Sequence, residues 1–317
     1  MRSSSKSSLL AIALFIGATL QSAPDSGAPS LAGQRVLWLG DSITQAGDYV
    51  TFAEYYLERA FPREKFDIIS IGRSGETTSG LSEKASPFPR PCVHDRLARA
   101  LDLAKPSVVI ACYGMNDGIY HPASLERMWA FQGGVRKLLD VCHAAGARVI
   151  LLTPPPFDRV PGKTLLPKEA PDFSYQTPYE DYDDVLADFA HWETTLPASV
   201  ATTIDLHGTM RDYLAAHRRI DPAFAFVKDG VHPNAAGHLF MAQTVLRGLG
   251  IPLAGADADL SKELVRIQAD PFYQLVKKQR EARSDAWLPY VGLPGNVELV
   301  EDFCGKLQAE IDRMRAP

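Results

Sequence analysis

The sequence predicts a doubly wound α/β domain built on a parallel sheet of five strands. Five short apolar runs recur along the chain, and helical stretches separate them. The runs are rich in Val, Ile and Leu and do not alternate strictly, which is typical of strands buried on both faces of a parallel sheet. The alternation of strand and helix places helices on both faces of that sheet.

The predicted elements follow one another in a regular order. Strands are expected at residues 35–40 (RVLWLG), 66–72 (FDIISIG), 107–114 (SVVIACYG), 147–153 (ARVILLT) and 200–205 (VATTID). Helical patterns fill the gaps at residues 49–60, 94–104, 124–145 and 179–196. Gly146 stands where a glycine commonly ends a helix. A later helix is expected between Asn234, which can cap it, and Gly250.

The whole chain has an ordinary globular composition. Its 317 residues are 46% hydrophobic and 22% charged, with a formal net charge of -5. This mild acidity, without a basic patch, disfavours nucleic-acid binding. No linker long enough for an independent second domain is seen. We therefore expect one main domain over residues 29–250 and a helical C-terminal extension over residues 251–317 that packs on it.

The N-terminus has the pattern of a secretory signal. Arg2 and Lys6 precede an apolar run at residues 9–20, and small residues follow. An apolar run of this length is too short to span a bilayer, so the order fits a signal peptide, with a short linker, over residues 1–28. An uncleaved anchor is the alternative, and the intact mass of secreted protein would distinguish the two. We expect a secreted or periplasmic protein without stable membrane association.

The cysteines lack the spacing of a metal site. Cys92, Cys112, Cys142 and Cys304 are widely scattered, with no C-x-x-C pair and no His/Cys cluster. Cys112 and Cys142 are expected as buried small hydrophobic residues. An oxidising compartment permits a disulfide, for instance between Cys92 and Cys304, but the sequence does not pair them. No metal and no organic cofactor is expected.

Three predicted strands end in polar or glycine-rich turns at one edge of the sheet. Ser42 follows the first strand, residues 72–76 follow the second, and residues 114–117 follow the third. Ligands of doubly wound sheets bind at this carboxyl edge. A serine just before a helix is either a helix cap or a nucleophile, and a nucleophile needs a base.

His232, in KDGVHPNAAGH, is the histidine with the most informative surroundings. Asp229 precedes it by three residues on the same loop, so its carboxylate can orient the imidazole and stabilise the imidazolium. Pro233 keeps His232 extended, outside the helix that follows. His238 lies inside that helix and is expected to be structural. An aspartate beside a glycine can also be a simple turn former, which is the alternative for Asp229.

A serine nucleophile that attacks a carbonyl group also needs donors for the negative oxygen of the tetrahedral intermediate. The candidates are the Gly75 amide in SGET, the Asn116 side-chain amide in GMND, and the Ser42 backbone amide at a helix start. Gly75 as a plain turn glycine and Asn116 as a turn-holding side chain are the alternatives. Asp41 is expected to be a structural cap, and Asp117 is ambiguous.

Taken together, these pieces resemble the sequence blocks of the SGNH, or GDSL-type, hydrolase family. The matches are Ser42 in GDSIT for block one, Gly75 for block two, Asn116 for block three, and Asp229 with His232 for the D-x-x-H block. Each block alone is weak, but four in order over residues 35–250 are specific. One departure is that Ser70 and Ile71 stand where block two usually has an asparagine. The resemblance implies a flavodoxin-like three-layer fold and ester hydrolysis through an acyl-serine.

The segment after the fourth strand bears on the substrate. Residues 154–178 hold seven prolines, and the aromatic residues in and just after this segment are Phe157, Phe173, Tyr175, Tyr179 and Tyr182. These aromatic rings either stack on sugars at the mouth of the site or belong to a proline-stiffened loop packed on the domain. The acidic run EDYDD lacks calcium-loop spacing and favours a helix N-terminus.

The expected function is that of a secreted carboxylester hydrolase acting on a small ester, with acetylated carbohydrate as the expected substrate. That preference depends on the secretion signal, the aromatic loop and the lack of a long apolar lid. A lipid or aryl esterase, a thioesterase and an acyltransferase are alternatives on the same residues. A non-catalytic carbohydrate-binding protein is an alternative from another class.

Overall fold

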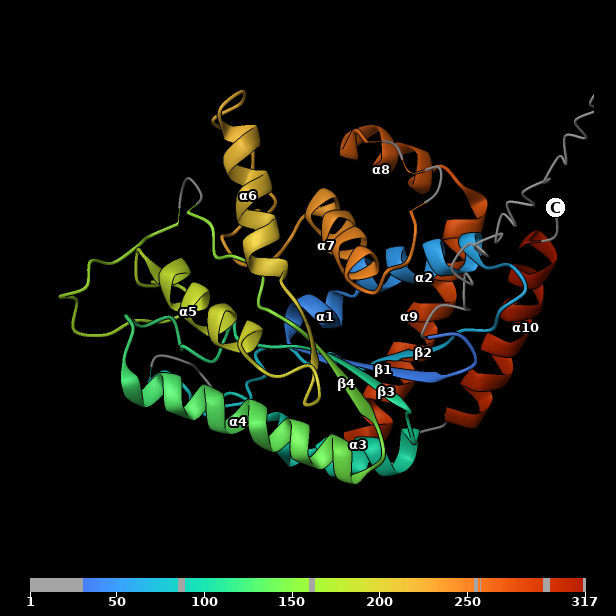
Figure 1. The fold of residues 1–317 in the computed structure, drawn as a ribbon, viewed down its shortest axis with the longest axis horizontal. Helices are drawn as coiled ribbons and strands as arrows, with labels where there is room; N and C mark the ends of the chain where they lie inside the picture. The colour runs from blue at the N-terminus through green and yellow to red at the C-terminus, as the bar shows by residue number, and fades with distance from the viewer. Residues whose placement is uncertain are drawn as a thin grey trace, which may run out of the picture.

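A five-stranded parallel sheet lies at the centre of the molecule (Figure 1). The computed structural model describes residues 31–84, 89–159, 163–253, 256, 258–292 and 297–315, so the predicted signal peptide lies outside the described residues. The strands are β1 (Arg35–Gly40), β2 (Asp67–Ser70), β3 (Val108–Cys112), β4 (Arg148–Leu152) and β5 (Thr202–Ile204). Their order in the sheet is β2-β1-β3-β4-β5 with every pair parallel, which confirms the predicted fold class.

Helices cover both faces of this sheet. They are α1 (Ser42–Ala46), α2 (Asp48–Ala60), α3 (Leu97–Ala104), α4 (Leu125–Ala144), α5 (Tyr182–Thr194), α6 (Leu206–Arg218) and α7 (Ala235–Gly248), with a short 3₁₀ turn, η1 (Val93–Asp95), before α3. Helices α2 and α7 pack together on one face, and α3 and α4 lie on the other (Figure 1). The helix start that the sequence predicted at Ser42 is the short helix α1, which Gly47, at a positive φ of 70°, separates from α2. Helix α6 was not predicted from the sequence.

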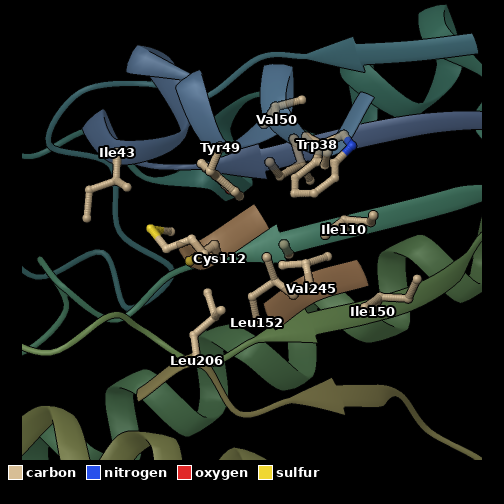
Figure 2. Packing of buried hydrophobic residues seen from close by; sticks show 14 of the residues in the cluster. Trp38, Ile43, Tyr49, Val50, Ile110, Cys112, Ile150, Leu152, Leu206 and Val245 are labelled. Atoms are coloured by element: carbon tan, nitrogen blue, oxygen red, sulfur yellow. The ribbon is translucent and has the colours of Figure 1, made fainter. Parts of the chain in front are cut away.

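The core is packed between the sheet and the helices. Trp38, Ile110 and Ile150 pair across β1, β3 and β4, so their side chains share one face of the sheet. On that face the Trp38 ring meets Tyr49 of α2 edge to face, with the ring centroids 5.3 Å apart (Figure 2). Val245 of α7 is also fully buried there. All five residues of β3 are buried, as expected for a strand covered on both sides.

Close packing fixes the turn from β1 into α1. A Cβ atom at Gly40 would lie 2.1 Å from Thr44 Oγ1 and 2.8 Å from the carbonyl oxygen of Cys112. A Cβ at Gly72 would lie 2.3 Å from the backbone nitrogen of Gln45. Only glycine fits at both positions, because α1 lies directly against the ends of the neighbouring strands. The residue after Asp41 is therefore held at the carboxyl edge of the sheet.

The described residues after 251 form the helices α8 (Leu260–Gln268), α9 (Pro271–Gly292) and α10 (Val297–Arg315), which pack on the rest of the domain. Arg283 of α9 donates hydrogen bonds to the carbonyl oxygen of Ile68 (2.8 Å) and to Asp67 Oδ1 (2.7 Å), both in the edge strand β2. The Tyr56 hydroxyl of α2 donates to Glu263 of α8 at 2.6 Å. No helix in the described ranges is long and apolar enough to cross a membrane.

The cysteines are free thiols, and no disulfide joins Cys92 to Cys304. Cys92 is half-buried beside the carbonyl oxygen of Thr78, whereas Cys304 is buried in α10 against Gln279. Cys112 and Cys142 are buried, as the sequence predicted. Among the described residues, no group of His, Cys, Asp or Glu side chains has the arrangement of a metal site.

Candidate active site

Ser42, His232 and Asp229 form a continuous hydrogen-bonded series. Ser42 Oγ lies 2.8 Å from His232 Nε2, although the two residues are 190 positions apart in the chain. On the other side of the ring, His232 Nδ1 lies 2.7 Å from Asp229 Oδ2. The carboxylate can therefore fix the imidazole tautomer in which Nε2 is free to accept the serine proton. The structure brings the three predicted residues together in the predicted order.

Asp41, and not Ser42, caps the helix at this position. Asp41 Oδ1 accepts a hydrogen bond from the Ile43 amide at 2.9 Å, and Ser42 is the first residue of α1. The predicted structural role of Asp41 is therefore confirmed, and the alternative that Ser42 is the helix cap is wrong. Burial raises the pKa of Asp41 to about 7, although the hydrogen bond from the Ile43 amide opposes this shift. Ser42 Oγ is left facing His232.

The loop that carries the histidine is rigidly built. Asp229 Oδ1 accepts hydrogen bonds from the amides of Val231 (3.0 Å) and His232 (2.8 Å), so the aspartate both closes the turn and faces the ring. Gly230 has a positive φ of 88°, and a Cβ there would lie 2.8 Å from the carbonyl oxygen of Asp158. Asn234 caps α7 by accepting from the Gly237 amide at 2.9 Å, as the sequence predicted.

His238, the other histidine of this region, is structural. Its side chain is buried in α7 and stacks on the Tyr49 ring with the ring centroids 6.0 Å apart. Burial lowers the pKa of His238 to about 4, so its imidazole is neutral near neutral pH. The structure therefore agrees with the role predicted for it.

A tyrosine from the segment after β4 supports the aspartate. The Tyr175 hydroxyl donates to Asp229 Oδ2, the same oxygen that faces the imidazole, at 2.8 Å. Lys163 Nζ donates to the Asp229 carbonyl oxygen at 2.7 Å and lies 4.3 Å from the centre of the Tyr175 ring. Partial burial opposes ionisation of Asp229. Hydrogen bonds from the backbone and ring of His232, and then from Tyr175, outweigh this effect and hold the pKa of the carboxyl well below its usual range.

Replacement of Tyr175 by phenylalanine tests this support. We expect kcat/KM to fall about tenfold, or about 1.4 kcal/mol, because the carboxylate loses a donor that fixes its position. We also expect the downfield proton resonance of His232 Nδ1 to move further downfield, because Asp229 Oδ2 is no longer shared between two side-chain donors. Tyr179→Phe is the matched control, since its hydroxyl donates to Asp181 and not to Asp229. An unchanged resonance in Tyr175→Phe would contradict the assigned contact.

A cavity of about 370 Å³ opens in front of Ser42. Its lining combines the nucleophile and base candidates with polar groups and two tyrosines: Ser42, Ser74, Gly75, Glu83, Arg90, Asn116, Tyr120, Ser174, Tyr175, Gln176 and His232. Two of the three predicted oxyanion donors, Gly75 and Asn116, thus lie beside Ser42, whose own backbone amide is the third. Gly75 has a positive φ of 75°, so it also has the conformation of a turn glycine.

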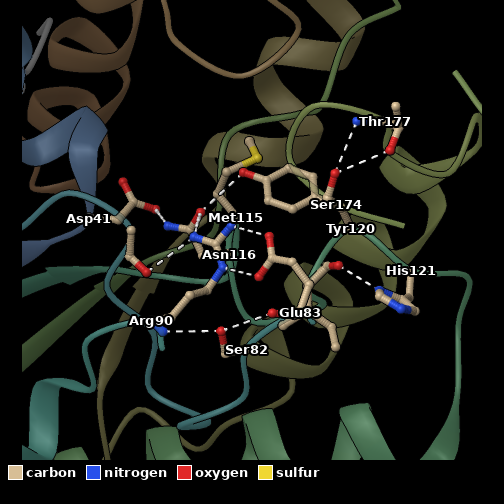
Figure 3. A network of polar contacts seen from close by, with 12 residues as sticks. Asp41, Ser82, Glu83, Arg90, Met115, Asn116, Tyr120, His121, Ser174 and Thr177 are labelled. Carbon is tan, nitrogen blue, oxygen red and sulfur yellow. Dashed lines mark hydrogen bonds and ion pairs between the residues drawn. The ribbon is translucent and has the colours of Figure 1, made fainter. Parts of the chain in front are cut away.

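The Asn116 side chain is held on all sides (Figure 3). Its Nδ2 donates to Asp41 Oδ2 (3.3 Å) and to the carbonyl oxygen of Glu76 (3.2 Å). Its Oδ1 accepts from Arg90 Nη1 (2.9 Å) and from the Tyr120 hydroxyl (3.1 Å). Both bonds from Nδ2 are long, so donation to an oxyanion requires only that one of them be shared or given up.

Asp117, which the sequence left ambiguous, is structural. Its Oδ1 accepts from the amides of Thr78 (2.8 Å) and Ser79 (2.7 Å), and its Oδ2 accepts from the Gly114 amide (3.0 Å). The side chain thereby ties the loop after β3 to the loop after β2. This connection fixes the distance between the segments that carry Gly75 and Asn116.

The aromatic residues after β4 divide into two groups. Phe157, Phe173 and Tyr182 are buried in the domain. The interpretation that their rings stack on a sugar is therefore wrong for these three residues. Tyr175 alone of the five lines the cavity. Asp183 and Asp184 of the acidic run lie in the first turn of α5, as the sequence predicted. The described part of the segment is thus mostly packed on the domain, with one tyrosine at the site.

A serine, a histidine and an aspartate hydrogen-bonded in series at the carboxyl edge of a parallel sheet are the arrangement that serine hydrolases use. The model of the GDSL-like Lipase/Acylhydrolase family matches residues 38–239, so the chain belongs to this family and is an SGNH-type serine esterase. A search of the curated proteins found no match.

Solved structures share the fold at low sequence identity. A catalytic mutant of Axe2, an acetylxylan esterase from Geobacillus stearothermophilus, has a TM-score of 0.52 and 19% identity over 71% of this chain and 98% of that chain. A second Axe2 mutant, described as an acetyl-xylooligosaccharide esterase, has a TM-score of 0.53 and 20% identity over 70% and 96% of the two chains. BT4096, a gut microbial diltiazem-metabolizing enzyme, has a TM-score of 0.51 and 20% identity over 70% of this chain and 48% of that chain. This chain thus spans about half of BT4096.

Proposed function

We propose that the chain hydrolyses carboxylic esters through the triad Ser42, His232 and Asp229. The observation that carries this proposal is the pair of hydrogen bonds at 2.8 Å and 2.7 Å that joins the three side chains. His232 Nε2 takes the hydroxyl proton as Ser42 Oγ attacks the acyl carbon, and Asp229 stabilises the imidazolium. The amides of Ser42 and Gly75 and the side chain of Asn116 donate to the oxyanion.

The two steps, acylation of Ser42 and hydrolysis of the acyl-serine, need no reactant other than the ester and water. When the tetrahedral intermediate collapses, the bond from the acyl carbon to the alcohol oxygen breaks, and the imidazolium returns its proton to the departing alcohol. Water, deprotonated by His232, next attacks the acyl-serine. The serine oxygen leaves with the proton, and the carboxylic acid is released.

We propose further that the physiological substrate is an O-acetylated carbohydrate and that the protein is exported. A cavity of about 370 Å³ with hydroxyl, amide, carboxylate and guanidinium groups in its lining suits a small acyl group and a hydroxyl-rich alcohol better than a long alkyl chain. Acetylxylan esterases among the similar folds, and the N-terminal signal pattern, support the same choice.

A substrate panel tests the choice of substrate. We expect acetate release from acetylated xylooligosaccharides, and we expect kcat/KM on 4-nitrophenyl esters to fall at least about tenfold from acetyl to octanoyl. The reason is that a cavity of this size and polarity gains little from additional methylene groups. Ser42→Ala is the control for non-enzymatic release. Equal or rising activity with chain length, or no release from any acetylated sugar, would contradict the carbohydrate substrate and favour a lipid or aryl esterase.

A further inference from the structure

One guanidinium nitrogen contacts both oxyanion residues that lie outside α1. Arg90 Nη1 donates to Asn116 Oδ1 at 2.9 Å (Figure 3). The same nitrogen donates to the carbonyl oxygen of Gly75 at 3.2 Å. No motif in the sequence pointed to this arginine. Its position between the two residues raises the question of what it does for the reaction.

Arg90 is itself locked in place by Glu83. Its Nε donates to Glu83 Oε2 at 2.5 Å, and its Nη2 donates to Glu83 Oε1, which makes a bidentate pair. The two side chains are only 9% and 1% exposed, and the guanidinium carbon lies 5.4 Å from the centre of the Tyr120 ring. The planar guanidinium is therefore fixed in orientation as well as in position.

This arrangement decides which way the Asn116 amide faces. With Oδ1 on the guanidinium, Nδ2 lies on the side of Asp41, the neighbour of Ser42. An amide turned over by 180° would place its NH₂ group against the guanidinium and its oxygen against the Asp41 carboxyl. Its oxygen would also face the oxyanion and repel it. In the same way, the hydrogen bond from Arg90 to the Gly75 carbonyl oxygen fixes the turn that presents the Gly75 amide.

We propose that Arg90, held by Glu83, is a positioning residue that sets the orientation of the Asn116 and Gly75 donors. This inference rests on the proposed oxyanion role of those two residues. Four of the five guanidinium N–H groups are used, two on Glu83 and two on the carbonyl oxygens, and the ion pair cancels the charge. Arg90 therefore acts through its neighbours and not as a binding site for a charged substrate.

A double-mutant cycle on 4-nitrophenyl acetate tests the proposal. We expect Arg90→Met to lower kcat about 10- to 100-fold with KM changed less than about twofold. The reason is that misplaced Asn116 and Gly75 donors stabilise the oxyanion of the transition state less well and leave substrate binding almost unchanged. In the Asn116→Ala variant, the same substitution should lower kcat by no more than about a further threefold. Arg90→Lys should still have a kcat at least about fivefold below that of the unmodified protein, because a single ammonium group cannot make the several directed hydrogen bonds of the planar guanidinium.

Arg73→Met is the matched control, since Arg73 is exposed, lies two residues from Gly75 and loses the same charge. It should keep the activity of the unmodified protein. Multiplicative effects of Arg90→Met and Asn116→Ala, a loss confined to KM, or full activity in Arg90→Lys would each overturn the proposal. Should Arg90→Met fail to fold, Glu83→Gln gives the second measurement, with an expected loss in kcat of about three- to tenfold.

Failure of the proposed function has a different signature. Turnover retained in Ser42→Ala would remove the triad mechanism, whatever the outcome of the cycle. If Ser42→Ala is inactive and Asn116→Ala is fully active, then the hydrolase assignment stands and the role of Arg90 is overturned.

Discussion

Replacement of Ser42 by alanine is expected to lower kcat on 4-nitrophenyl acetate about 10⁴- to 10⁶-fold while the protein stays folded. The loss follows because Ser42 Oγ is the atom that faces His232 Nε2 at 2.8 Å. The fold should survive because Asp41, not Ser42, caps α1. Thermal melting of the variant should lie within a few degrees of the unmodified protein, and steady-state kinetics measure the loss.

Two controls sharpen this experiment. Ser107→Ala makes the same substitution at the amino end of β3, the opposite edge of the sheet, and should leave turnover unchanged. A serine-directed phosphonate should label Ser42 alone in the unmodified protein and label nothing in Ser42→Ala. A label on another serine would contradict the proposed mechanism, and so would a Ser42→Ala variant whose turnover is close to that of the unmodified protein.

The second large effect is expected for Asp229→Asn. An asparagine can face Nδ1 with its NH₂ group, which selects the wrong tautomer of His232, and so we expect kcat to fall about 10³- to 10⁴-fold. The hydrogen bonds that lower the pKa of Asp229 keep its carboxylate ionised as the pH falls to about 4. The ¹³C shift of its carboxyl carbon should therefore remain that of the ionised form over this range.

Asp221→Asn serves as the control for the loss of one negative charge. Asp221 is exposed and accepts a hydrogen bond from the Ala223 amide at 3.0 Å, as a turn aspartate does, without contact to the triad. Its substitution should leave kcat unchanged. A titration of the Asp229 carboxyl near pH 6, or an Asp229→Asn variant with more than a tenth of the original kcat, would contradict the orienting role.

The sequence predicted the sheet well because its signals are local. Runs such as 107–114 are apolar throughout, and buried parallel strands require that pattern. The triad could be predicted for a different reason. Ser42 and His232 each follow a strand or precede a helix in a characteristic local motif, and the rules of α/β topology bring strand ends to one edge.

The supporting residues could not be predicted, because their signals are not local. Arg90 and Glu83 themselves lie outside the helices and strands, and nothing in their spacing marks a bidentate pair that turns toward Asn116. Tyr175 stood out only as one of five aromatic residues in a long loop. Its contact with Asp229 depends on how that loop closes across the sheet edge, which only the three-dimensional structure shows.

The contacts of Arg283 with β2 have a consequence for the solubility of shortened chains. A strand at the margin of a sheet offers unpaired backbone groups to any other extended chain, and proteins avoid aggregation by covering them. Here Arg283 occupies the Ile68 carbonyl, and α9 packs along that margin. A chain cut after residue 250 would keep every proposed catalytic group yet uncover this strand, so we expect the shortened chain to self-associate.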